Sequence, residues 1–312
     1  MKHCFIINPF AGRHDSTKDL EEKLEKIFEN RSDTYEIYVT TGPNDATIEI
    51  KKRCIANETK EKPEDITFYI CGGDGTCFEA INGIVGYPHA RMTIVPVGSC
   101  NDFLKSYPEC DFSIIENLID GEEKTIDVLK VNDRYSLNVA NIGYDAKVNY
   151  DCVRFRYKYK TVKQSYNHAI IRNILKPLGD MVKITTDNNE ILFNKKALLI
   201  VVANGQYYGG GFRCAPYAIC DDGLLDIVVV KKVNILTFAR LIKYYKIGEH
   251  LANSKFNNII TYGKSQKVTI ESDALLCLCL DGETFHMNKI EIESVPNAVR
   301  FVFPRVKSKN KA

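Results

Sequence analysis

Residues Ile66–Val85 read ITFYICGGDGTCFEAINGIV, with a glycine-rich turn between two apolar runs. The apolar start of this stretch, Ile66–Cys71, predicts a β-strand, and the apolar positions of Phe78–Val85 predict a helix. The Gly72-Gly73-Asp74-Gly75-Thr76 turn between them predicts a phosphate-binding loop, because backbone N–H groups and a helix N-terminus both attract anionic oxygens. An aspartate in such a loop would repel a bare phosphate, so Asp74 indicates contact through Mg²⁺ or action on a hydroxyl group. The loop therefore indicates phosphoryl transfer rather than nucleotide storage.

The segments around this loop alternate between strand-like and helix-like patterns. Strands are expected at Cys4–Ile7, Tyr35–Thr40 and Met92–Val97, and helices at Thr17–Phe28 and Ala46–Ala56. This order predicts a parallel sheet with helices on both faces. Ligands of such sheets bind at the carboxyl ends of the strands, and four turn residues fall there: Asn8, Thr40, Gly72 and Gly98.

From about Ile126 onward, short alternating strands separated by turn residues dominate the sequence. This pattern predicts an antiparallel β-domain, most simply a β-sandwich. We therefore expect an α/β domain over residues 1–125, completed by roughly 298–312, and a β-sandwich over 126–297. The expected strands of the second domain are Thr125–Val131, Ser136–Ile142, Met181–Thr186, Lys195–Ala203, Leu224–Val230, Lys267–Ser272 and Ile290–Val295, with helices near 160–176 and 234–252.

Composition indicates the class of protein but not its partner. A chain of 312 residues with 45% hydrophobic and 26% charged residues is typical of a globular protein of one large or two ordinary domains. The net charge of +2 means that any membrane affinity must come from a local patch. The 11 cysteines include no CxxC pair, which predicts reduced, buried thiols rather than a zinc site. No signal peptide is evident and no apolar run approaches the ~20 residues of a membrane span, so a cytoplasmic location is expected.

Two further turns of the first domain carry polar groups. Asn8–Arg13 reads NPFAGR and follows the first strand, while Pro96–Phe103 reads PVGSCNDF and follows the fourth. Adjacent parallel strands would bring Ser99 and Asp102 near Asp74. The alternative is an ordinary strand-to-helix turn with a capping side chain.

Two turns of the second domain carry carboxylates. Leu280–Glu283 reads LDGE, which suits a simple hairpin turn but also a base that takes a proton from an alcohol. Asp221–Leu224 reads DDGL, and its aspartates and turn carbonyls are hard-oxygen ligands suited to Mg²⁺ or Ca²⁺. A solvated turn is the alternative there.

Taken together, these motifs resemble the diacylglycerol kinase catalytic family, which includes bacterial lipid kinases and the sphingosine and ceramide kinases. The resemblance covers nearly the whole chain and rests on INPFAGR, CGGDGT, PVGSCNDF, NIGYDA, DDGLLDI and LDGE. GGDGT alone is shared with NAD kinases. The resemblance implies a phosphofructokinase- or NAD-kinase-like nucleotide domain and an antiparallel β-sandwich lipid-binding domain.

The resemblance also implies roles for individual residues. ATP would be held by Asn8, Pro9, Phe10, Ala11, Gly12, Thr40, Gly72, Gly73, Asp74, Gly75, Thr76, Cys77, Phe78 and Ser99. Asp281 and Glu283 would lie at the acceptor hydroxyl, where either could accept its proton. Asp74 would organise Mg²⁺ and the γ-phosphate, or itself act as the base. A structural Mg²⁺ would be bound by Asp222 with the carbonyls of Ile219 and Leu224, and Asp145 would face the lipid head.

One departure from the family pattern falls in the fourth-strand turn. The family's usual threonine-glycine pair is Ser99-Cys100 here. Serine keeps the hydroxyl that would contact ATP, whereas Cys100 replaces a small, flexible residue.

The segment Arg154–Lys176 contains seven basic residues and no acidic ones, with aromatic residues between them. Apolar residues at four-residue spacing predict a helix with one apolar face: Val162, Tyr166, Ile170 and Ile174. Basic and aromatic side chains together suit docking on anionic lipid headgroups. A solvated face is the alternative, and nucleic acid is not an expected partner, because no RNA-recognition motif accompanies the segment.

These patterns predict an ATP- and Mg²⁺-dependent lipid kinase whose acceptor is diacylglycerol and which contacts anionic membranes peripherally. The sequence leaves a homodimer open. An NAD kinase is the enzymatic alternative, but the NP turn, the GSCND turn and the basic segment favour a lipid acceptor. A non-catalytic nucleotide- or lipid-binding protein is the other alternative, and the presence of Asp74, Asp281 and Glu283 argues against it.

Overall fold

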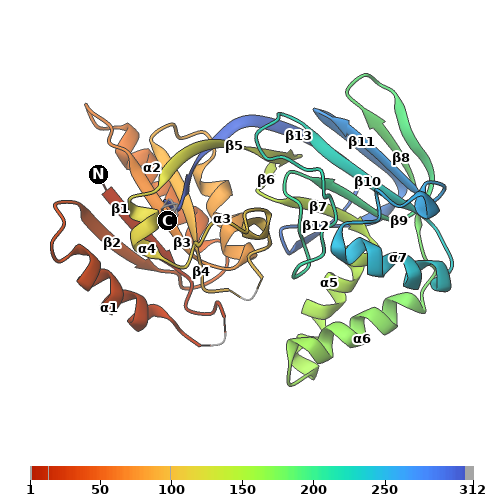
Figure 1. Ribbon diagram of the computed structural model, residues 1–312, viewed down its shortest axis with the longest axis horizontal. Coiled ribbons are helices and arrows are strands. Elements are labelled where there is room, and N and C mark those ends of the chain that lie inside the picture. Colours follow the sequence, from red (N-terminus) through yellow and green to blue (C-terminus); the bar gives the residue numbers. More distant parts are fainter. Residues whose placement is uncertain (1, 13, 99, 306–312) are drawn as a thin grey trace, which may run out of the picture. The chain divides into compact units, whose positions relative to one another are not determined.

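The computed structural model describes residues 2–12, 14–98 and 100–305. The chain forms two compact units. Unit 1 comprises Met1–Val128 and Pro296–Ala312, and unit 2 comprises Leu129–Val295. Figure 1 colours them along the sequence, so unit 2 runs from yellow-green to blue.

Unit 1 is built on a parallel sheet, as its alternating sequence pattern predicts. The strand order is β2-β1-β3-β4-β13, with β1 Lys2–Ile7, β2 Thr34–Val39, β3 Ile66–Gly72, β4 Ala90–Pro96 and β13 Glu283–Phe303. Its helices are α1 Thr17–Phe28, α2 Asp45–Glu58, α3 Asp74–Ile84 and α4 Ile115–Ile119, with a 3-10 turn η1 at Asp102–Ser106. Phe28 of α1 packs against the Phe5 ring of β1, with 6.3 Å between ring centroids. Gly83 of α3 leaves room for Ile50 of α2, so α2 and α3 lie close together.

A strand from far along the chain completes the sheet of unit 1. Arg300 and Phe301 of β13 pair in parallel with Arg91 and Met92 of β4. The Thr93 hydroxyl donates to the carbonyl of Val302 at 2.7 Å. The Arg300 guanidinium also forms ion pairs with Asp65 and with Glu123 of β5 (Glu122–Val131), both at 2.7 Å.

Unit 2 is antiparallel. Its strands follow the order β11-β10-β9-β7-β12-β13, and β8 also pairs with both β9 and β12. The bounds are β6 Arg134–Ser136, β7 Val139–Gly143, β8 Asp180–Thr186, β9 Ile191–Ala203, β10 Leu225–Lys231, β11 Ile260–Ser265 and β12 Lys267–Leu280. Its helices are α5 Tyr144–Arg154, α6 Val162–Ile174 and α7 Ile235–Ile247, with 3-10 turns η2 Arg156–Lys158 and η3 Ser254–Phe256.

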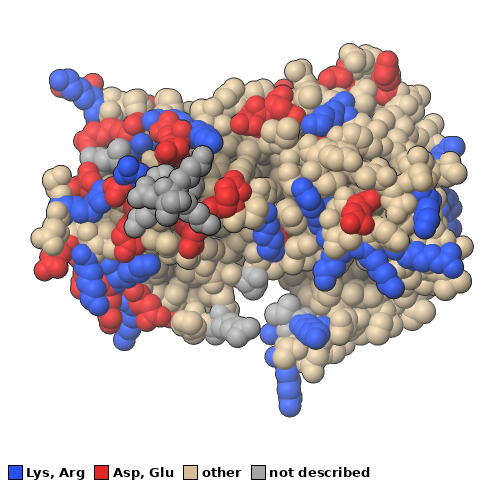
Figure 2. Space-filling model, viewed as in Figure 1, with Lys and Arg blue, Asp and Glu red and all other residues tan. Residues whose placement is uncertain are grey.

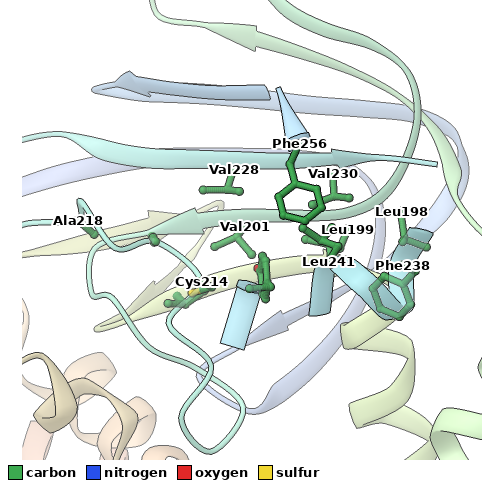
Figure 3. Close-up of a cluster of buried hydrophobic side chains, with 14 residues drawn as sticks. Leu198, Leu199, Val201, Cys214, Ala218, Val228, Val230, Phe238, Leu241 and Phe256 are labelled. Carbon is green, nitrogen blue, oxygen red and sulfur yellow. The ribbon is translucent and has the colours of Figure 1, made fainter. Parts of the chain in front are cut away.

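The main core described for unit 2 lies between α7 and the neighbouring strands. Figure 3 shows Phe238 and Leu241 of α7 among the aliphatic side chains of β9 and β10, including Val201 and Val228. Residues 197–203 of β9 and 227–230 of β10 are buried at every position, which agrees with their continuous apolar runs, because strands covered on both faces have no polar alternation.

Two sequence expectations for unit 2 were wrong, and one helix, α5, was not predicted at all. The expected strand Ser136–Ile142 is interrupted after Ser136, and its second part begins at Val139. The buried face of α6 consists of Ser165, Ala169 and Asn173, whereas Tyr166 of the expected apolar face is exposed.

The eleven cysteines all lie in the described ranges and none is in a disulfide; most are buried. Within the described ranges, none of the helices combines the length and apolar character needed to cross a bilayer.

Candidate active site

The carboxyl ends of β1, β3 and β4 pack backbone against backbone. Gly98 N–H donates to the carbonyl of Gly72 at 3.1 Å, and a Cβ on Gly98 would lie 2.4 Å from the Cα of Gly73. Gly12 has φ +84°, and a Cβ there would lie 2.4 Å from the carbonyl oxygen of Val97. The glycines of the three turns are therefore required by close approach, and they leave main-chain groups at the surface of this edge.

Asn8 links the turn after β1 to the glycine loop after β3 through hydrogen bonds. Its N–H donates to the Cys71 carbonyl, and its side-chain amide donates to the Thr76 hydroxyl, both at 3.0 Å. The Asn8 side-chain carbonyl oxygen accepts the N–H of Phe10, also at 3.0 Å, while Phe10 itself is exposed. Thr40 lies at the end of β2, where its N–H donates to the Ile7 carbonyl. The candidate nucleotide residues of β1, β2 and β3 thus share one edge of the sheet.

Asp74 is the first residue of α3, so the helix begins inside the glycine loop rather than at Phe78 as expected. Its Oδ1 accepts the N–H of Asp102 at 2.9 Å, which confirms the predicted proximity of the two turns. Ser99 lies outside the described residues. The side chains of Cys77 and Phe78 are buried, so a ligand could meet only their main chain. The amides of the first helical turn, around Gly75 and Thr76, point toward the loop because no preceding turn accepts them.

Gly98→Ala is expected to disrupt this edge, because the added Cβ would collide with backbone rather than with a movable side chain. Overpacking of this kind costs about 1–3 kcal/mol. We expect a lower Tm and at least a tenfold weaker affinity for ATP, measured by thermal unfolding and isothermal titration calorimetry. Gly42→Ala is the matched control, since nothing lies within 4 Å of the position that its added methyl group would occupy. Wild-type ATP affinity in Gly98→Ala would contradict the assignment of this edge to the nucleotide.

Asp281 anchors a loop. It lies in the turn between β12 and β13 with φ +45°, and its carboxylate accepts four hydrogen bonds. Oδ2 accepts from the Ser136 hydroxyl and the Leu137 N–H, both at 2.8 Å, and from the Asn138 N–H at 3.4 Å; Oδ1 accepts the Val139 N–H at 3.0 Å. Burial raises the pKa of Asp281, and these donors oppose that rise. The four bonds also explain why the predicted strand breaks at Leu137.

Glu283 has a different environment from Asp281, although only Gly282 separates them. It is the first residue of β13, and it is exposed. Among the described residues, no hydrogen bond or ion pair of its carboxylate is observed. Of the two carboxylates proposed for the acceptor hydroxyl, Glu283 is therefore the one that remains available to a ligand.

The Asp222 turn does not suit a divalent cation. The Leu224 N–H donates to Asp222 Oδ1 at 3.0 Å, and the Lys264 ammonium contacts Asp222 Oδ2 at 2.9 Å. Both carboxylate oxygens are thus engaged by protein donors. Within the described part of the chain, no three His, Cys, Asp or Glu side chains cluster as metal ligands. The Asp222 carboxylate, which was expected to bind Mg²⁺ with the carbonyls of Ile219 and Leu224, is therefore already engaged by the Leu224 N–H and the Lys264 ammonium.

Asp145 lies in the first turn of α5, close to the Tyr208 hydroxyl. Burial raises its pKa to about 6, and hydrogen bonding from Tyr208, Ala146 and Asn141 offsets only part of this rise. Its Oδ2 is buried and has no hydrogen-bond partner within 3.5 Å among the described residues. The Asp145 carboxyl group is thus enclosed by unit 2, and one of its oxygens has no hydrogen-bond donor among the described residues.

The raised pKa of Asp145 predicts a pH dependence of stability. The folded state holds its proton up to about pH 6, whereas the unfolded chain loses it near 3.8, so this contribution is present at low pH and is lost as the pH rises through 6. Between pH 5 and pH 7.5 the free energy of unfolding should fall by about 1 kcal/mol through this group. Asp145→Asn should remove that part of the decline in urea unfolding curves, and exposed Asp273→Asn should not. Parallel curves for wild type and Asp145→Asn would contradict this assignment.

Part of the positive charge of the segment Arg154–Lys176 is neutralised by ion pairs in the structure. Asp151 of α5 accepts from both Arg172 and Lys176 at 3.1 Å. The lysine and arginine residues nearer the α5–α6 connection have no acidic partner within the segment Arg154–Lys176. Figure 2 shows Lys and Arg side chains at this end of the helix pair, at the bottom of the view. Large apolar side chains next to these helices are exposed, including Tyr157 of η2 at 79% and Leu175, which follows α6, at 80%.

A cavity of about 370 Å³ lies beside these helices in unit 2. Its lining includes Lys147, Arg172, Leu178, Leu275 and Cys277. None of the candidate catalytic carboxylates lines it.

Sequence reasoning missed Lys264 and Ser136, which engage two of the predicted carboxylates. Lys264 could have been found from the register of β10 with β11, which places it opposite Asp226. Ser136 carries no local signal, because its partner Asp281 lies 145 positions further along the chain.

Comparison with known proteins identifies both parts of the chain. Residues 2–131 match the diacylglycerol kinase catalytic domain, and residues 138–303 match the YegS C-terminal NAD kinase beta sandwich-like domain. A diacylglycerol kinase of Bacillus subtilis (strain 168) is 28% identical over 99% of this chain and 98% of its own length. A diacylglycerol kinase of Staphylococcus epidermidis (strain ATCC 12228 / FDA PCI 1200) is 27% identical over 89% of this chain and 84% of its own.

A solved structure is also similar to this chain over nearly its whole length. The crystal structure of a diacylglycerol kinase from Bacillus anthracis str. Sterne matches with a TM-score of 0.70 and 27% identity, over 98% of both chains. The α/β unit and the antiparallel unit therefore have the two-domain architecture that the sequence predicted, with a nucleotide domain followed by a β-sandwich-like domain. The chain belongs to the diacylglycerol kinase catalytic family.

Proposed function

We propose that this protein is an ATP-dependent lipid kinase that transfers the γ-phosphoryl group of ATP to the free hydroxyl of diacylglycerol. The observation that carries the proposal is the packed edge of unit 1, where Asp74 lies at the N-terminus of α3 and accepts the Asp102 N–H. Membership of the diacylglycerol kinase catalytic family supports the choice of acceptor.

ATP would bind at this edge through main-chain groups. The phosphates would meet the first turn of α3, where amide groups and the helix dipole favour anions. Asn8, Gly12 and Thr40 would position the rest of the nucleotide, with the adjacent turn residues Pro9, Phe10, Ala11 and Ser99. The close approach of Gly72, Gly73 and Gly98 leaves no side chain to obstruct the phosphates.

Mg²⁺ would enter with ATP. Phosphate-bound Mg²⁺ characteristically takes one or two protein carboxylates, with water and phosphate oxygens as its other ligands. Asp74, a single carboxylate beside a phosphate-binding turn, fits that donor set. The ion would neutralise charge on the transferred group, and the Asp102 N–H would keep the Asp74 carboxylate oriented.

Glu283 is proposed as the base that accepts the proton of the lipid hydroxyl. Its carboxylate is exposed, whereas that of Asp281 is committed to four donors. Asp281 would then be a positioning residue that holds Ser136–Val139 against the turn carrying Glu283. Asp145 would accept a hydrogen bond from the lipid head through its unpaired Oδ2.

The deciding experiment is incubation of the purified protein with Mg²⁺, γ-labelled ATP and diacylglycerol in mixed micelles. Labelled phosphatidate, identified by mass spectrometry, is the expected product. A parallel reaction with NAD tests the kinase activity that shares the GGDGT loop. Phosphorylation of NAD alone, or nucleotide binding without phosphorylation of any lipid in a total extract, would overturn the proposal.

The α5–α6 pair is proposed to contact anionic membrane surfaces peripherally, where the acceptor resides. Exposed apolar and aromatic side chains there accompany cations that have no carboxylate partner in the segment, such as Lys158, which lies 5.6 Å over the ring of Tyr157. Each cation near an anionic surface contributes roughly 1 kcal/mol.

Replacing Arg154, Lys158 and Lys163 by glutamine together should therefore weaken binding to phosphatidylglycerol vesicles about 100-fold in sedimentation assays. Lys183, Lys195 and Lys196, exposed on β8 and β9, give a matched triple control with the same change in charge. Equal loss of binding in both triple variants would place the membrane contact elsewhere.

A further inference from the structure

We infer that the ammonium group of Lys264 takes the place of a bound metal ion at the Asp222 turn, so that this turn folds without a divalent cation. The Lys264 Nζ lies 2.9 Å from Asp222 Oδ2, 3.2 Å from Asp226 Oδ2 and 3.4 Å from the carbonyl oxygen of Tyr217. Three oxygens, from Tyr217, Asp222 and Asp226, thus lie around this one ammonium group.

The strand register holds Lys264 in this position. Lys264 of β11 is the direct cross-strand partner of Asp226 in β10, so their side chains share one face of the sheet. Tyr262 lies two residues before Lys264 on the same face, and its hydroxyl donates to Asp226 Oδ1 at 2.6 Å. The Tyr217 and Tyr262 rings meet edge to face at 5.8 Å. The lysine therefore belongs to a built arrangement and is not a mobile surface side chain.

Burial explains why a cation is needed there. The Asp226 side chain is only 1% exposed, and a buried carboxylate without a counter-charge or hydrogen-bond donors is costly. The Lys264 ammonium donates hydrogen bonds to Asp222 Oδ2 and the Tyr217 carbonyl and forms an ion pair with Asp226 Oδ2. It therefore supplies the positive charge at this position.

A metal ion would compete with these contacts. Mg²⁺ demands nearly octahedral oxygen ligands at about 2.0–2.1 Å. Asp222 Oδ1 already accepts the Leu224 N–H, and Oδ2 faces the ammonium. A divalent ion would have to displace Lys264 and then lie beside its positive charge. The inference concerns the folding of unit 2 and holds whether or not the protein is a lipid kinase.

The first test uses the wild-type protein without nucleotide. We expect the Tm to stay within about 1 °C when 5 mM EDTA replaces 10 mM MgCl2, since about 1 kcal/mol would shift the Tm of such a unit by 2–4 °C. Mn²⁺ titration followed by electron paramagnetic resonance should show no binding that depends on Asp222. A Tm that falls by several degrees in EDTA would overturn the inference, as would Mn²⁺ binding that is lost in Asp222→Asn but kept in Asp74→Asn.

The second test asks whether removing the lysine creates a metal site. Lys264→Met should lower the Tm by about 5–10 °C, because it leaves a buried carboxylate without its cation. Millimolar Mg²⁺ or Mn²⁺ should then restore part of the loss, with one ion bound per chain. Lys267→Met, exposed in the same part of unit 2, is the matched control and should show neither effect. A Lys264→Met protein with unchanged Tm would contradict the inference; if this variant does not fold, the wild-type measurements still decide it.

Discussion

Replacing Glu283 by glutamine is expected to lower kcat about 10²–10⁴-fold, the usual contribution of a positioned general base. Glutamine keeps the shape of the side chain but cannot accept the hydroxyl proton. Because Glu283 is exposed and its carboxylate makes no observed hydrogen bond or ion pair within the described residues, its replacement should leave the Tm and the KM for ATP unchanged. Initial rates with labelled ATP and micellar diacylglycerol, together with thermal unfolding, measure both effects.

Glu293→Gln is the matched control, since Glu293 is an exposed carboxylate on the same strand. Asp281→Asn should behave differently from Glu283→Gln. It replaces charge-assisted hydrogen bonds to three amides and a hydroxyl, so the free energy of unfolding should fall by about 2–4 kcal/mol, and turnover should fall with the displaced loop. If Asp281→Asn kept the wild-type Tm but lost all turnover while Glu283→Gln remained active, Asp281 would be the base instead.

Asp74→Asn is expected to reduce kcat/KM about 10²–10³-fold, the scale of losing one electrostatic stabiliser of the transition state. Its amide oxygen can still accept the Asp102 N–H, so the edge of the sheet should remain intact, but a neutral side chain holds Mg²⁺ poorly. The rate should therefore require a higher Mg²⁺ concentration at fixed ATP.

Asp19→Asn provides the control for Asp74→Asn, because Asp19 is an exposed carboxylate near the start of another unit 1 helix. A Mg²⁺ dependence identical to that of the wild type would remove Asp74 from the handling of the metal.

The sequence was most informative where chain-local patterns determine structure. The apolar spacing of Thr17–Phe28 predicts α1 with the bounds observed, and the strand-turn-helix order around Gly72 predicts the edge of unit 1. The α5 helix was missed because its buried face includes Asp151, and a charged residue is not expected in a hydrophobic core. Only the packing of α6 on α5 supplies the partners Arg172, Asn173 and Lys176 that make such burial tolerable.

The roles of the individual carboxylates were also hard to predict, because they too depend on partners that are distant in the sequence. Asp281 and Glu283 look alike in LDGE, but long-range donors engage one and leave the other exposed. From the sequence, Asp222 looks like a metal ligand. In the structure, the pairing of β10 with β11 places the Lys264 ammonium beside its carboxylate. Motifs thus identify which turns carry chemistry, whereas tertiary contacts decide what each oxygen can do.

The late strand of unit 1 has a consequence for biosynthesis. Residues 299–303 of β13 lie beside β4 in a sheet whose strands β1 to β4 all precede residue 97, and all of unit 2 is translated in between. A ribosome-bound chain must therefore keep the β4 edge unpaired until unit 2 has emerged, which exposes an apolar strand edge to aggregation. Nascent chains halted before Arg300 should depend on chaperones, whereas unit 2, an uninterrupted insertion, can fold ahead of the nucleotide unit that began first.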